Sequence, residues 1–363
     1  MEISPEHKRI LSGAARGPLA ALLRGLLLIA SLPYGLVVRA RNILYDNGLL
    51  AEYRADRPVV SIGNITTGGT GKTPAVEFAA RWFLERGARP AILSRGYRSR
   101  AGRNDEAMLL AAHLPDIPHY QDPNRFRAAV EATKVGDANV LVLDDGLQHR
   151  RLTRFAEVVL VDATCPFGYG HLLPRGLLRE PINGLRRADL IVLTRGDLIS
   201  EDELTVLMER LDRIAPDVPK ATASHQPTGV ARFPDGAPEP PGTLSGRRVG
   251  LFCSIGNPDA FRQTVEGLGA RVEWAATFPD HHWYTTEDLA GIVRAEHRPV
   301  EVFVTTEKDA VKLLEFCTEG GEPVWPKDKP LMVLRIEMAI RSGAAELEAL
   351  FEEALQAAQY DEG

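Results

Sequence analysis

A glycine-rich segment at residues 61–74 has the composition of a phosphate-binding loop. It reads SIGNITTGGTGKTP, follows an apolar strand-like run and precedes a helical pattern; it departs from the strict P-loop pattern at Thr66, which occupies the first glycine position. Glycines let backbone N–H groups turn toward phosphate oxygens, and the N-terminus of the following helix adds partial positive charge. Lys72 can then reach the β- and γ-phosphates, while the Thr73 hydroxyl can hold Mg²⁺. The segment predicts a nucleotide site made by Thr67, Gly68, Gly69, Thr70, Gly71, Lys72 and Thr73.

Two adjacent acids end the apolar run of the segment NVLVLDDGLQH, residues 139–149. Asp144 and Asp145 fall at the carboxyl end of an expected strand, where ligands bind in open parallel sheets. A carboxylate at this position can hold Mg²⁺ or its waters, and the second acid can orient water or a basic group. We therefore expect both acids to contribute to a metal site beside the glycine-rich loop.

A third polar segment, SRGYRSRAGRNDE at 94–106, places several arginines and then Asp105 and Glu106 just beyond a strand end. Phosphoryl transfer needs a base near the acceptor hydroxyl and positive charge near the phosphates, and this segment offers both. A solvated charged loop is the alternative interpretation. Further along, the stretch LLPRGLLREP at 172–181 combines arginines with apolar residues, which fits a wall for an anionic amphiphile.

The composition is that of a folded globular protein, and the cysteine content fits a reducing compartment. The chain has 363 residues, of which 44% are hydrophobic and 25% charged, and its formal net charge is −6. This length predicts two domains, and the charge gives no overall basic field for nucleic acid. The cysteines Cys165, Cys253 and Cys317 form no CxxC pair, so neither a zinc knuckle nor a disulfide framework is indicated.

The elements that must position these residues alternate between apolar runs and helical patterns. Continuous Val, Ile and Leu runs separated by helices predict a parallel sheet covered on both faces, the α/β class, here of the P-loop NTPase type. A Pro- and Gly-rich stretch is expected to link this part to a smaller α/β domain. The expected organisation is an N-terminal helix (1–42), a P-loop domain (43–225), a linker (226–246), a smaller domain (247–340) and a C-terminal helix (341–363).

The N-terminal segment from Pro18 to Val38 is apolar and flanked by basic residues. Its leucines recur at helical spacing on one broad face, so it predicts an amphipathic helix in the headgroup layer of an anionic membrane. Arg24, Pro33 and Gly35 interrupt the apolar run, which makes a spanning helix less fitting than an interfacial one. A buried core helix and a secretory signal peptide are the alternatives.

Seven motifs in this order resemble the tetraacyldisaccharide 4′-kinase family: GNITTGGTGKTP, LSRGY, NDE, DDGLQH, LLPRGLLREP, FPDHH and TTEKDAVK. The resemblance runs from the N-terminal helix to residue 313. It implies transfer of the ATP γ-phosphoryl group to the 4′-hydroxyl of a lipid A disaccharide 1-phosphate, with Mg²⁺ as cofactor. It also implies peripheral or monotopic attachment to the cytoplasmic face of the inner membrane.

The resemblance also implies roles for individual residues. The family's proposed base falls on Asp105, although Asn104 stands where the family has glycine, and the family's active histidine falls on His281. His282 beside it leaves open which imidazole is active. We expect Asp105 to act on the acceptor hydroxyl and His281, from the second domain, to tune it. Together with these residues we predict Lys72 for catalysis, Thr73, Asp144, Asp145 and Glu106 for the metal, and Arg125, His149, Arg179 and Glu180 for the substrate.

Two alternative hypotheses involve nucleotide hydrolysis without an acceptor lipid. The segment VLTRGD at 192–197 loosely resembles a guanine-specificity box, which would fit a GTPase or a metallochaperone-type NTPase. The other reading is a membrane-recruited ATP switch that binds a partner. Incubation with labelled ATP and a lipid A precursor distinguishes all three.

Overall fold

The computed structural model describes residues 5–96, 104–234, 236–294, 299–316, 325 and 330–360. The chain divides into two compact units, which we call the P-loop unit and the second unit. The P-loop unit comprises Pro5–Tyr97, Leu110–His225 and Met338–Gly363. Of the described residues, the second unit takes 104–109 and those that lie between Gln226 and Glu337.

These units differ from the expected domains at three places. Residues 104–109, which include Asp105, group with the second unit, while the C-terminal helix groups with the P-loop unit. The expected linker at 226–246 belongs to the second unit and contains the end of strand β7, strand β8 (Pro238–Glu239) and a short 3-10 helix. Its Val230 and Leu244 are fully buried, which explains why a Pro- and Gly-rich stretch is ordered here.

In the P-loop unit the described strands run in the order β7-β6-β5-β1-β4-β2-β3, and each of these neighbouring pairs is parallel. The central strands are buried along their whole length, as expected of a parallel sheet covered on both faces. The strands are β1 (Val59–Asn64), β2 (Pro90–Ser94), β3 (His119–Gln121), β4 (Val140–Asp144), β5 (Ala156–Asp162), β6 (Leu190–Thr194) and β7 (Lys220–Arg232).

Helices cover both faces of this sheet. Helices α3 (Lys72–Glu85) and α10 (Ala344–Tyr360) share one core with β1, and the rings of Phe83 and Phe351 lie 5.2 Å apart there. On the other face, α5 (Arg125–Lys134) and α6 (Glu201–Ile214) pack in two further cores. The expected parallel α/β fold is confirmed.

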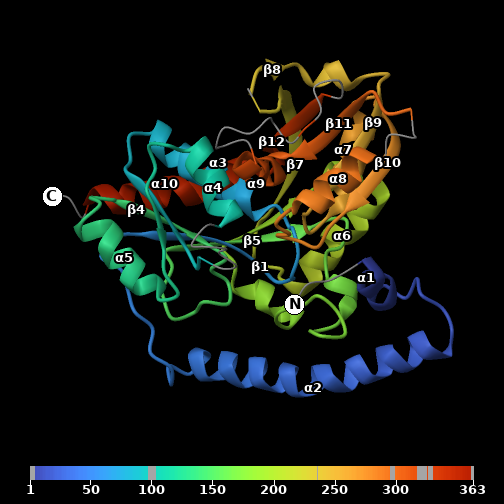
Figure 1. Cartoon of the computed structure of the whole chain (residues 1–363). Helices are drawn as coiled ribbons and strands as arrows, with labels where there is room; N and C mark the ends of the chain where they lie inside the picture. Colours follow the sequence, from blue (N-terminus) through green and yellow to red (C-terminus); the bar gives the residue numbers. More distant parts are fainter. Residues whose placement is uncertain are drawn as a thin grey trace. The chain divides into compact units, whose positions relative to one another are not determined.

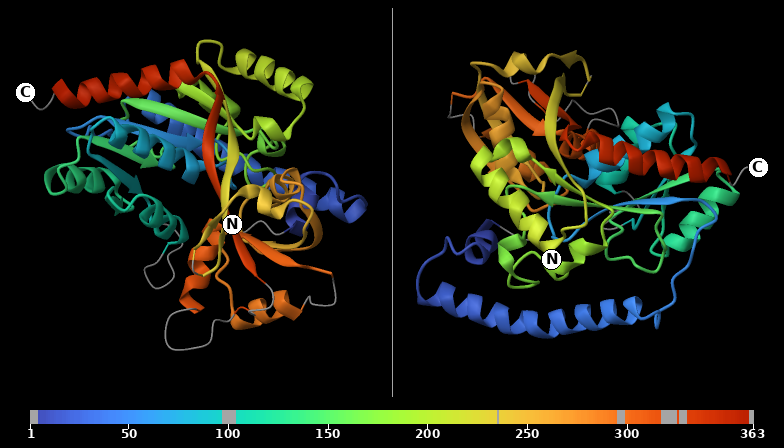
Figure 2. Two further views of the ribbon diagram at one scale, coloured as in Figure 1. Left: turned by 90° about the horizontal axis from the view of Figure 1, so that it is seen from above. Right: turned by 180° about the vertical axis from the view of Figure 1, so that it is seen from behind.

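Helix α2 (Pro18–Asp46) lies along the outside of the P-loop unit (Figure 1 and the right-hand view of Figure 2). It is continuous through Pro33, so it is longer than the uninterrupted apolar run in the sequence. By length and composition it could cross a membrane, and no other helix among the described residues meets that test. The short helix α1 (Pro5–Leu11) precedes it.

In the second unit the strands run in the order β10-β9-β11-β12, and the neighbouring strands are parallel. Helix α7 packs on one face, and α8 and α9 pack on the other. The elements are β9 (Arg248–Cys253), α7 (Pro258–Gly267), β10 (Arg271–Thr277), α8 (Thr286–Arg294), β11 (Val302–Thr306), α9 (Glu307–Leu313) and β12 (Leu331–Ser342). Helix α4 (Asp105–His113) begins in this unit, and the chain enters the P-loop unit within it. Short 3-10 helices are η1 (Gly168–Gly170), η2 (Ile182–Arg187), η3 (Gly196–Leu198), η4 (Pro241–Leu244) and η6 (Leu314–Phe316).

Candidate active site

The glycine-rich loop connects the end of β1 to the start of α3, the strand–loop–helix context that a P-loop requires. Gly71 caps α3 with a φ of +88°, a left-handed conformation that favours glycine. A Cβ atom at Gly71 would also lie only 2.4 Å from Nε2 of His225. Glycine is therefore required at this position both by the backbone and by the buried ring beneath it.

Asn64, at the end of β1, braces the loop from inside. Its Nδ2 donates to the carbonyl of Thr66 and to the hydroxyl of Thr70, both at 2.8 Å, and Lys72 Nζ donates to its Oδ1 at 3.3 Å. The Thr194 hydroxyl at the end of β6 donates to the Thr70 carbonyl at 2.9 Å. Sequence reasoning missed Asn64 and Thr194, although both follow apolar runs at the carboxyl end of parallel strands.

Asp145 is held between two cations. It has a φ of +57°, and its Oδ1 lies 3.5 Å from Lys72 Nζ and 2.6 Å from Arg179 Nη1. Burial raises the pKa of Asp145, but Lys72 and Arg179 outweigh burial and hold it below its usual range. The structure thus joins three residues that the sequence singled out separately, and it keeps Asp145 ionised beside the lysine of the loop.

Glu180 is fully buried, and its carboxylate already has three partners. Gln148 Nε2 donates to it at 2.8 Å, Arg187 Nη2 at 2.7 Å and Asn42 Nδ2 at 3.3 Å. Gln148 also donates to the carbonyl of Asn64. This position favours a bracing role for Glu180 over the predicted contact with a substrate.

The other two predicted substrate residues, Arg125 and His149, lie at the start of α5 and after the Asp144-Asp145 pair. Burial, followed by the charge of Arg125, lowers the pKa of His149 to about 4. His149 is therefore neutral at physiological pH, so one ring nitrogen can donate a hydrogen bond and the other can accept one. Arg125 is buried and donates to the carbonyl of Pro123 at 3.2 Å.

The buried ring of His225 makes the P-loop unit sensitive to acid. Burial and then the charge of Arg195 lower the pKa of His225 to about 3, while an unfolded histidine titrates near 6.5. Between these values the unfolded chain binds more protons, so stability falls as the pH decreases. We expect His225 to cost the wild-type protein about 2 kcal/mol of unfolding free energy between pH 7 and pH 5.

Denaturant unfolding at both pH values would measure this loss, with His225→Asn as the comparison. The variant lacks the titrating ring and should lose about 2 kcal/mol less over the same interval. His149 is present in both proteins, so its own contribution cancels. Equal losses in the two proteins would show that His225 does not set the acid sensitivity.

A second cluster of polar residues lies within the second unit. Asp105 begins α4, and its Oδ1 and Oδ2 lie 2.9 and 3.1 Å from Nδ1 of His281. Burial raises the pKa of Asp105, but the hydrogen bond from His281 and the charges of Lys308 and Lys312 lower it below its usual range. His281 has a φ of +63°, and its backbone N–H donates to the Ser254 carbonyl at 3.2 Å. Such left-handed non-glycine residues cluster at functional sites.

The neighbouring His282 makes different contacts. Its Nε2 lies 2.9 Å from Oδ2 of Asp288, which also accepts from the backbone N–H and hydroxyl of Thr285 at the start of α8. The ring stacks on Phe278 at a centroid distance of 5.0 Å. The structure therefore brings His281, and not His282, to Asp105.

Two lysines of α9 complete this cluster, and sequence reasoning missed both. Lys308 Nζ lies 3.2 Å from Oε1 of Glu106 and 3.4 Å from Nε2 of His281. Lys312 is fully buried, pairs with Asp309 at 2.8 Å and lies 3.8 Å from Oδ2 of Asp105. Their spacing of four residues in the segment TTEKDAVK was the available signal, because it places both on one helix face.

The candidate metal ligands fall into both units. Thr73, Asp144 and Asp145 are in the P-loop unit, whereas Glu106 is in the second unit and is paired with Lys308. Among the described residues, no group of three His, Cys, Asp or Glu side chains could hold a metal ion. The candidate ligands are all side-chain oxygens, and among the described residues they do not form a complete protein cage.

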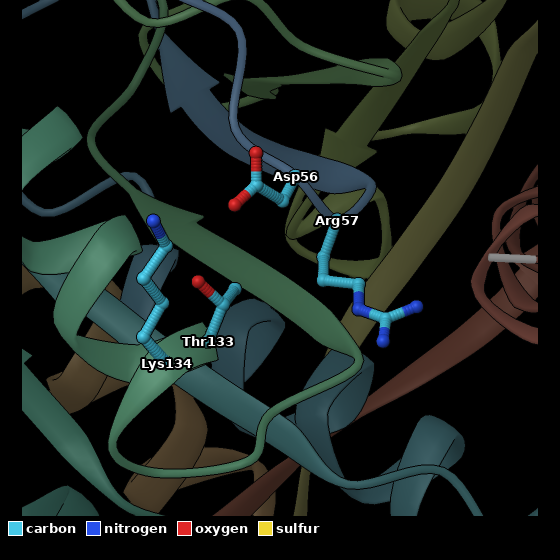
Figure 3. Close-up of a pocket in the computed structure, with 4 residues that line it drawn as sticks. All are labelled: Asp56, Arg57, Thr133 and Lys134. Carbon is cyan, nitrogen blue, oxygen red and sulfur yellow. The ribbon is translucent and has the colours of Figure 1, made fainter. Parts of the chain in front are cut away.

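The two remaining features belong to neither cluster. A pocket of about 320 Å³ is lined by Asp56, Arg57, Thr133 and Lys134, none of which is a candidate site residue (Figure 3). Arg195, in the segment that resembles a guanine box, is buried and paired with Asp162. The predicted arginines at 98–103 lie outside the described residues.

Comparisons with known proteins agree on one family. A family model described as tetraacyldisaccharide-1-P 4′-kinase matches residues 23–356. The tetraacyldisaccharide 4′-kinase of Anaeromyxobacter sp. (strain K) is 41% identical over 363 aligned residues, covering 94% of this chain and 93% of that protein. The protein of the same name from Syntrophus aciditrophicus (strain SB) is 38% identical and covers 90% of this chain and 91% of its own length.

A solved structure supports the same assignment. It is the "apo" form of LpxK from Aquifex aeolicus in complex with ATP, with a TM-score of 0.68 and 27% identity to this chain. The match covers 92% of this chain and 99% of that one. The chain, with its P-loop, its Asp144-Asp145 pair and its Asp105–His281 pair, belongs to the tetraacyldisaccharide 4′-kinase family.

Proposed function

We propose that this chain is an ATP-dependent lipid kinase that phosphorylates the 4′-hydroxyl of a tetraacyldisaccharide 1-phosphate in lipid A biosynthesis. The observation that carries the proposal is a P-loop lysine and a carboxylate–imidazole pair in a chain that matches one kinase family over residues 23–356. A P-loop alone fits many NTPases, so the match to one kinase family over residues 23–356 is what favours transfer over hydrolysis. In that reaction the carboxylate–imidazole pair can accept the proton of the acceptor hydroxyl.

The proposed reaction is an in-line transfer. The 4′-oxygen forms a bond to the γ-phosphorus, the bond from that phosphorus to the β–γ bridging oxygen breaks, and ADP leaves with the bond's electron pair. Asp105 takes the proton of the 4′-hydroxyl, and His281 donates its Nδ1–H to Asp105 and fixes the carboxylate. The Lys72 ammonium stabilises the charge on the transferred group.

We also propose that Mg²⁺ accompanies ATP, with Thr73 and Asp144 as its protein ligands. Hydroxyl and carboxylate oxygens suit this ion, which usually keeps several waters and takes one or two carboxylates plus substrate phosphates. The lack of a three-residue cage among the described residues fits this mode of binding. Bound in this way, the ion neutralises phosphate charge. Asp145 is the less suitable ligand because Lys72 and Arg179 already occupy one of its oxygens.

Incubating the protein with γ-labelled ATP and a tetraacyldisaccharide 1-phosphate in mixed micelles tests the function. Label should move to the lipid, and only at the 4′-position. Release of labelled phosphate at the same rate with and without lipid would instead identify a hydrolase. Faster hydrolysis of GTP than of ATP would identify a GTPase.

Helix α2 is proposed to attach the enzyme to the cytoplasmic face of the inner membrane. On one side it is fastened to the P-loop unit: the Tyr34 hydroxyl donates to the Arg179 carbonyl at 2.7 Å, and Arg150 donates to Asp46 at 2.6 Å. On the other side, several large apolar side chains, among them Ile29 and Leu32, are mostly exposed. A helix held along the protein on one face and apolar on the other fits interfacial attachment better than a free span.

Charging that exposed face should release the protein from membranes. Ile29, Leu32 and Leu36 are 64%, 65% and 70% exposed, so replacing all three by glutamate leaves the docked face unchanged. The loss of three partly inserted side chains should lower the vesicle partition coefficient by about 100-fold or more. Sedimentation with anionic phospholipid vesicles measures this change.

Val135→Glu and Val206→Glu are matched controls, because both positions are exposed, 82% and 61%, and lie outside α2. They should partition like the wild type. Deleting residues 1–42 is a blunter test, since it also removes Tyr34 and Asn42 from their partners. Unchanged partition of the triple variant would exclude α2 as the membrane-binding element.

A further inference from the structure

Lys308 occupies the centre of the Asp105 cluster. It is the second residue of α9, and its side chain is only 16% exposed. Its Nζ lies 3.2 Å from Glu106 Oε1, 3.4 Å from His281 Nε2, 3.6 Å from Asp280 Oδ1 and 4.0 Å from Asp105 Oδ2. It is therefore the cation that reaches both the carboxylate and the imidazole of the proposed catalytic pair.

These contacts determine which ring nitrogen of His281 carries the proton. Nδ1 faces both carboxylate oxygens of Asp105 at 2.9 and 3.1 Å, and an ionised carboxylate can only accept. Nε2 faces the Lys308 ammonium, which can only donate. Both contacts are satisfied by a single state, a neutral imidazole with hydrogen on Nδ1 and a lone pair on Nε2.

A competing acceptor lies on the Nε2 side. Asp280 Oδ2 is 3.7 Å from Nε2, so without a cation between them Asp280 would favour a proton there. Lys308 opposes this, because its Nζ contacts both groups, at 3.4 Å from Nε2 and 3.6 Å from Asp280 Oδ1, and an ammonium group near Nε2 disfavours a proton there. A carboxylate thus lies near each ring nitrogen of His281. Because Lys308 disfavours a proton on Nε2, only Nδ1, which faces Asp105, is protonated.

We propose that Lys308 is a positioning residue for the transfer reaction, because it holds His281 in the Nδ1–H tautomer and so orients Asp105 toward the acceptor hydroxyl. This inference rests on the proposed kinase function. In serine hydrolase triads Nε2 is the base and the carboxylate only orients the ring. Here Nε2 is directed at an ammonium group, so the carboxylate is the proton acceptor and the ring orients it.

The wild-type tautomer can be measured without any activity assay. The full chain is labelled with ¹⁵N in its histidine rings, and multiple-bond ¹H–¹⁵N spectra are recorded at pH 7.5. Of nine histidines, His281 is assigned as the ring missing in His281→Gln. We expect Nδ1 to resonate as a protonated nitrogen and Nε2 as an unprotonated one. A proton on Nε2, in a neutral or a charged ring, overturns the proposal.

Variants of Lys308 then test whether the lysine is the cause. Lys308→Met should place a proton on Nε2 and lower kcat by about 10–100-fold with little change in KM for ATP, because the carboxylate loses its alignment. Lys308→Arg keeps a donor cation and should restore the wild-type spectrum and most of kcat. Arg335→Met is the matched control: it removes an ion pair to Glu307, beside Lys308, and should leave both readouts unchanged.

The outcomes separate the inference from the function on which it rests. A folded Lys308→Met variant with wild-type kcat or a wild-type His281 spectrum overturns the role of Lys308. If Lys308→Met does not fold, the wild-type spectrum and Lys308→Arg still decide. Absence of lipid phosphorylation by the wild type would reject the proposed function, while the spectrum reports independently on the tautomer.

Discussion

Replacing Lys72 by alanine is expected to lower kcat/KM for phosphoryl transfer by at least about 100-fold. Lys72 begins α3 and directs its Nζ toward Asn64 and Asp145, at 3.3 and 3.5 Å. Both contacts are long enough for the ammonium group to turn to a phosphate. When Lys72 is removed, Asp145 still keeps Arg179 as a partner at 2.6 Å. The fold should therefore persist in the variant. A radiometric transfer assay and a thermal melt measure the two effects.

Lys134→Ala is the matched control, because Lys134 is an exposed lysine of the same unit and lines the pocket in Figure 3. It should retain wild-type activity. If Lys72→Ala melts normally and transfers phosphate at a near-normal rate, the glycine-rich loop is not the ATP site.

Asp105→Asn is expected to lower kcat by about 10²–10⁴, the usual size of a general-base effect, with little change in KM for ATP. The asparagine keeps the shape of the side chain and its oxygen can still accept from the Glu106 backbone N–H, as Asp105 does at 2.9 Å. It cannot take up the hydroxyl proton. Steady-state kinetics with ATP and lipid varied in turn separate the two parameters.

His281→Ala should also lower kcat, and the double variant should lose less than the product of the two single losses, because the residues are in direct contact. Fully multiplicative losses would mean that the two act separately. His282→Ala is the neighbouring control; it removes the contact with Asp288 and should affect the stability of α8 more than kcat. A defect in His282→Ala alone would move the active imidazole by one residue.

The strand-end motifs could be predicted because their chemistry is local. Gly71, Lys72 and Thr73 are consecutive, and a strand, a loop and a helix place them with little help from the rest of the chain. The same holds for Asp144 and Asp145 at the end of β4. Continuous apolar runs also fixed the fold class, since only a sheet covered on both faces buries such strands.

Contacts between distant segments could not be predicted in this way. The pairing of Asp105 with His281 came from family resemblance, and the grouping of residues 104–109 with the second unit was not foreseen. Nothing in the composition of α9 shows that Lys308 reaches the ring of a residue 27 positions away. Buried polar networks, such as that of Glu180 with Gln148 and Arg187, cannot be predicted from the sequence either, because each partner alone is of a residue type that is usually exposed.

The fastening of α2 bears on how the enzyme is handled in solution. Tyr34 holds the Arg179 carbonyl, Arg179 holds Asp145, and Asp145 faces Lys72. A detergent that displaces α2 from the protein therefore removes a support of the ATP site as well as the membrane attachment. Extraction conditions should accordingly be chosen by measuring the affinity for ATP. In a preparation that binds ATP weakly, α2 is expected to be displaced while the rest of the fold is still intact.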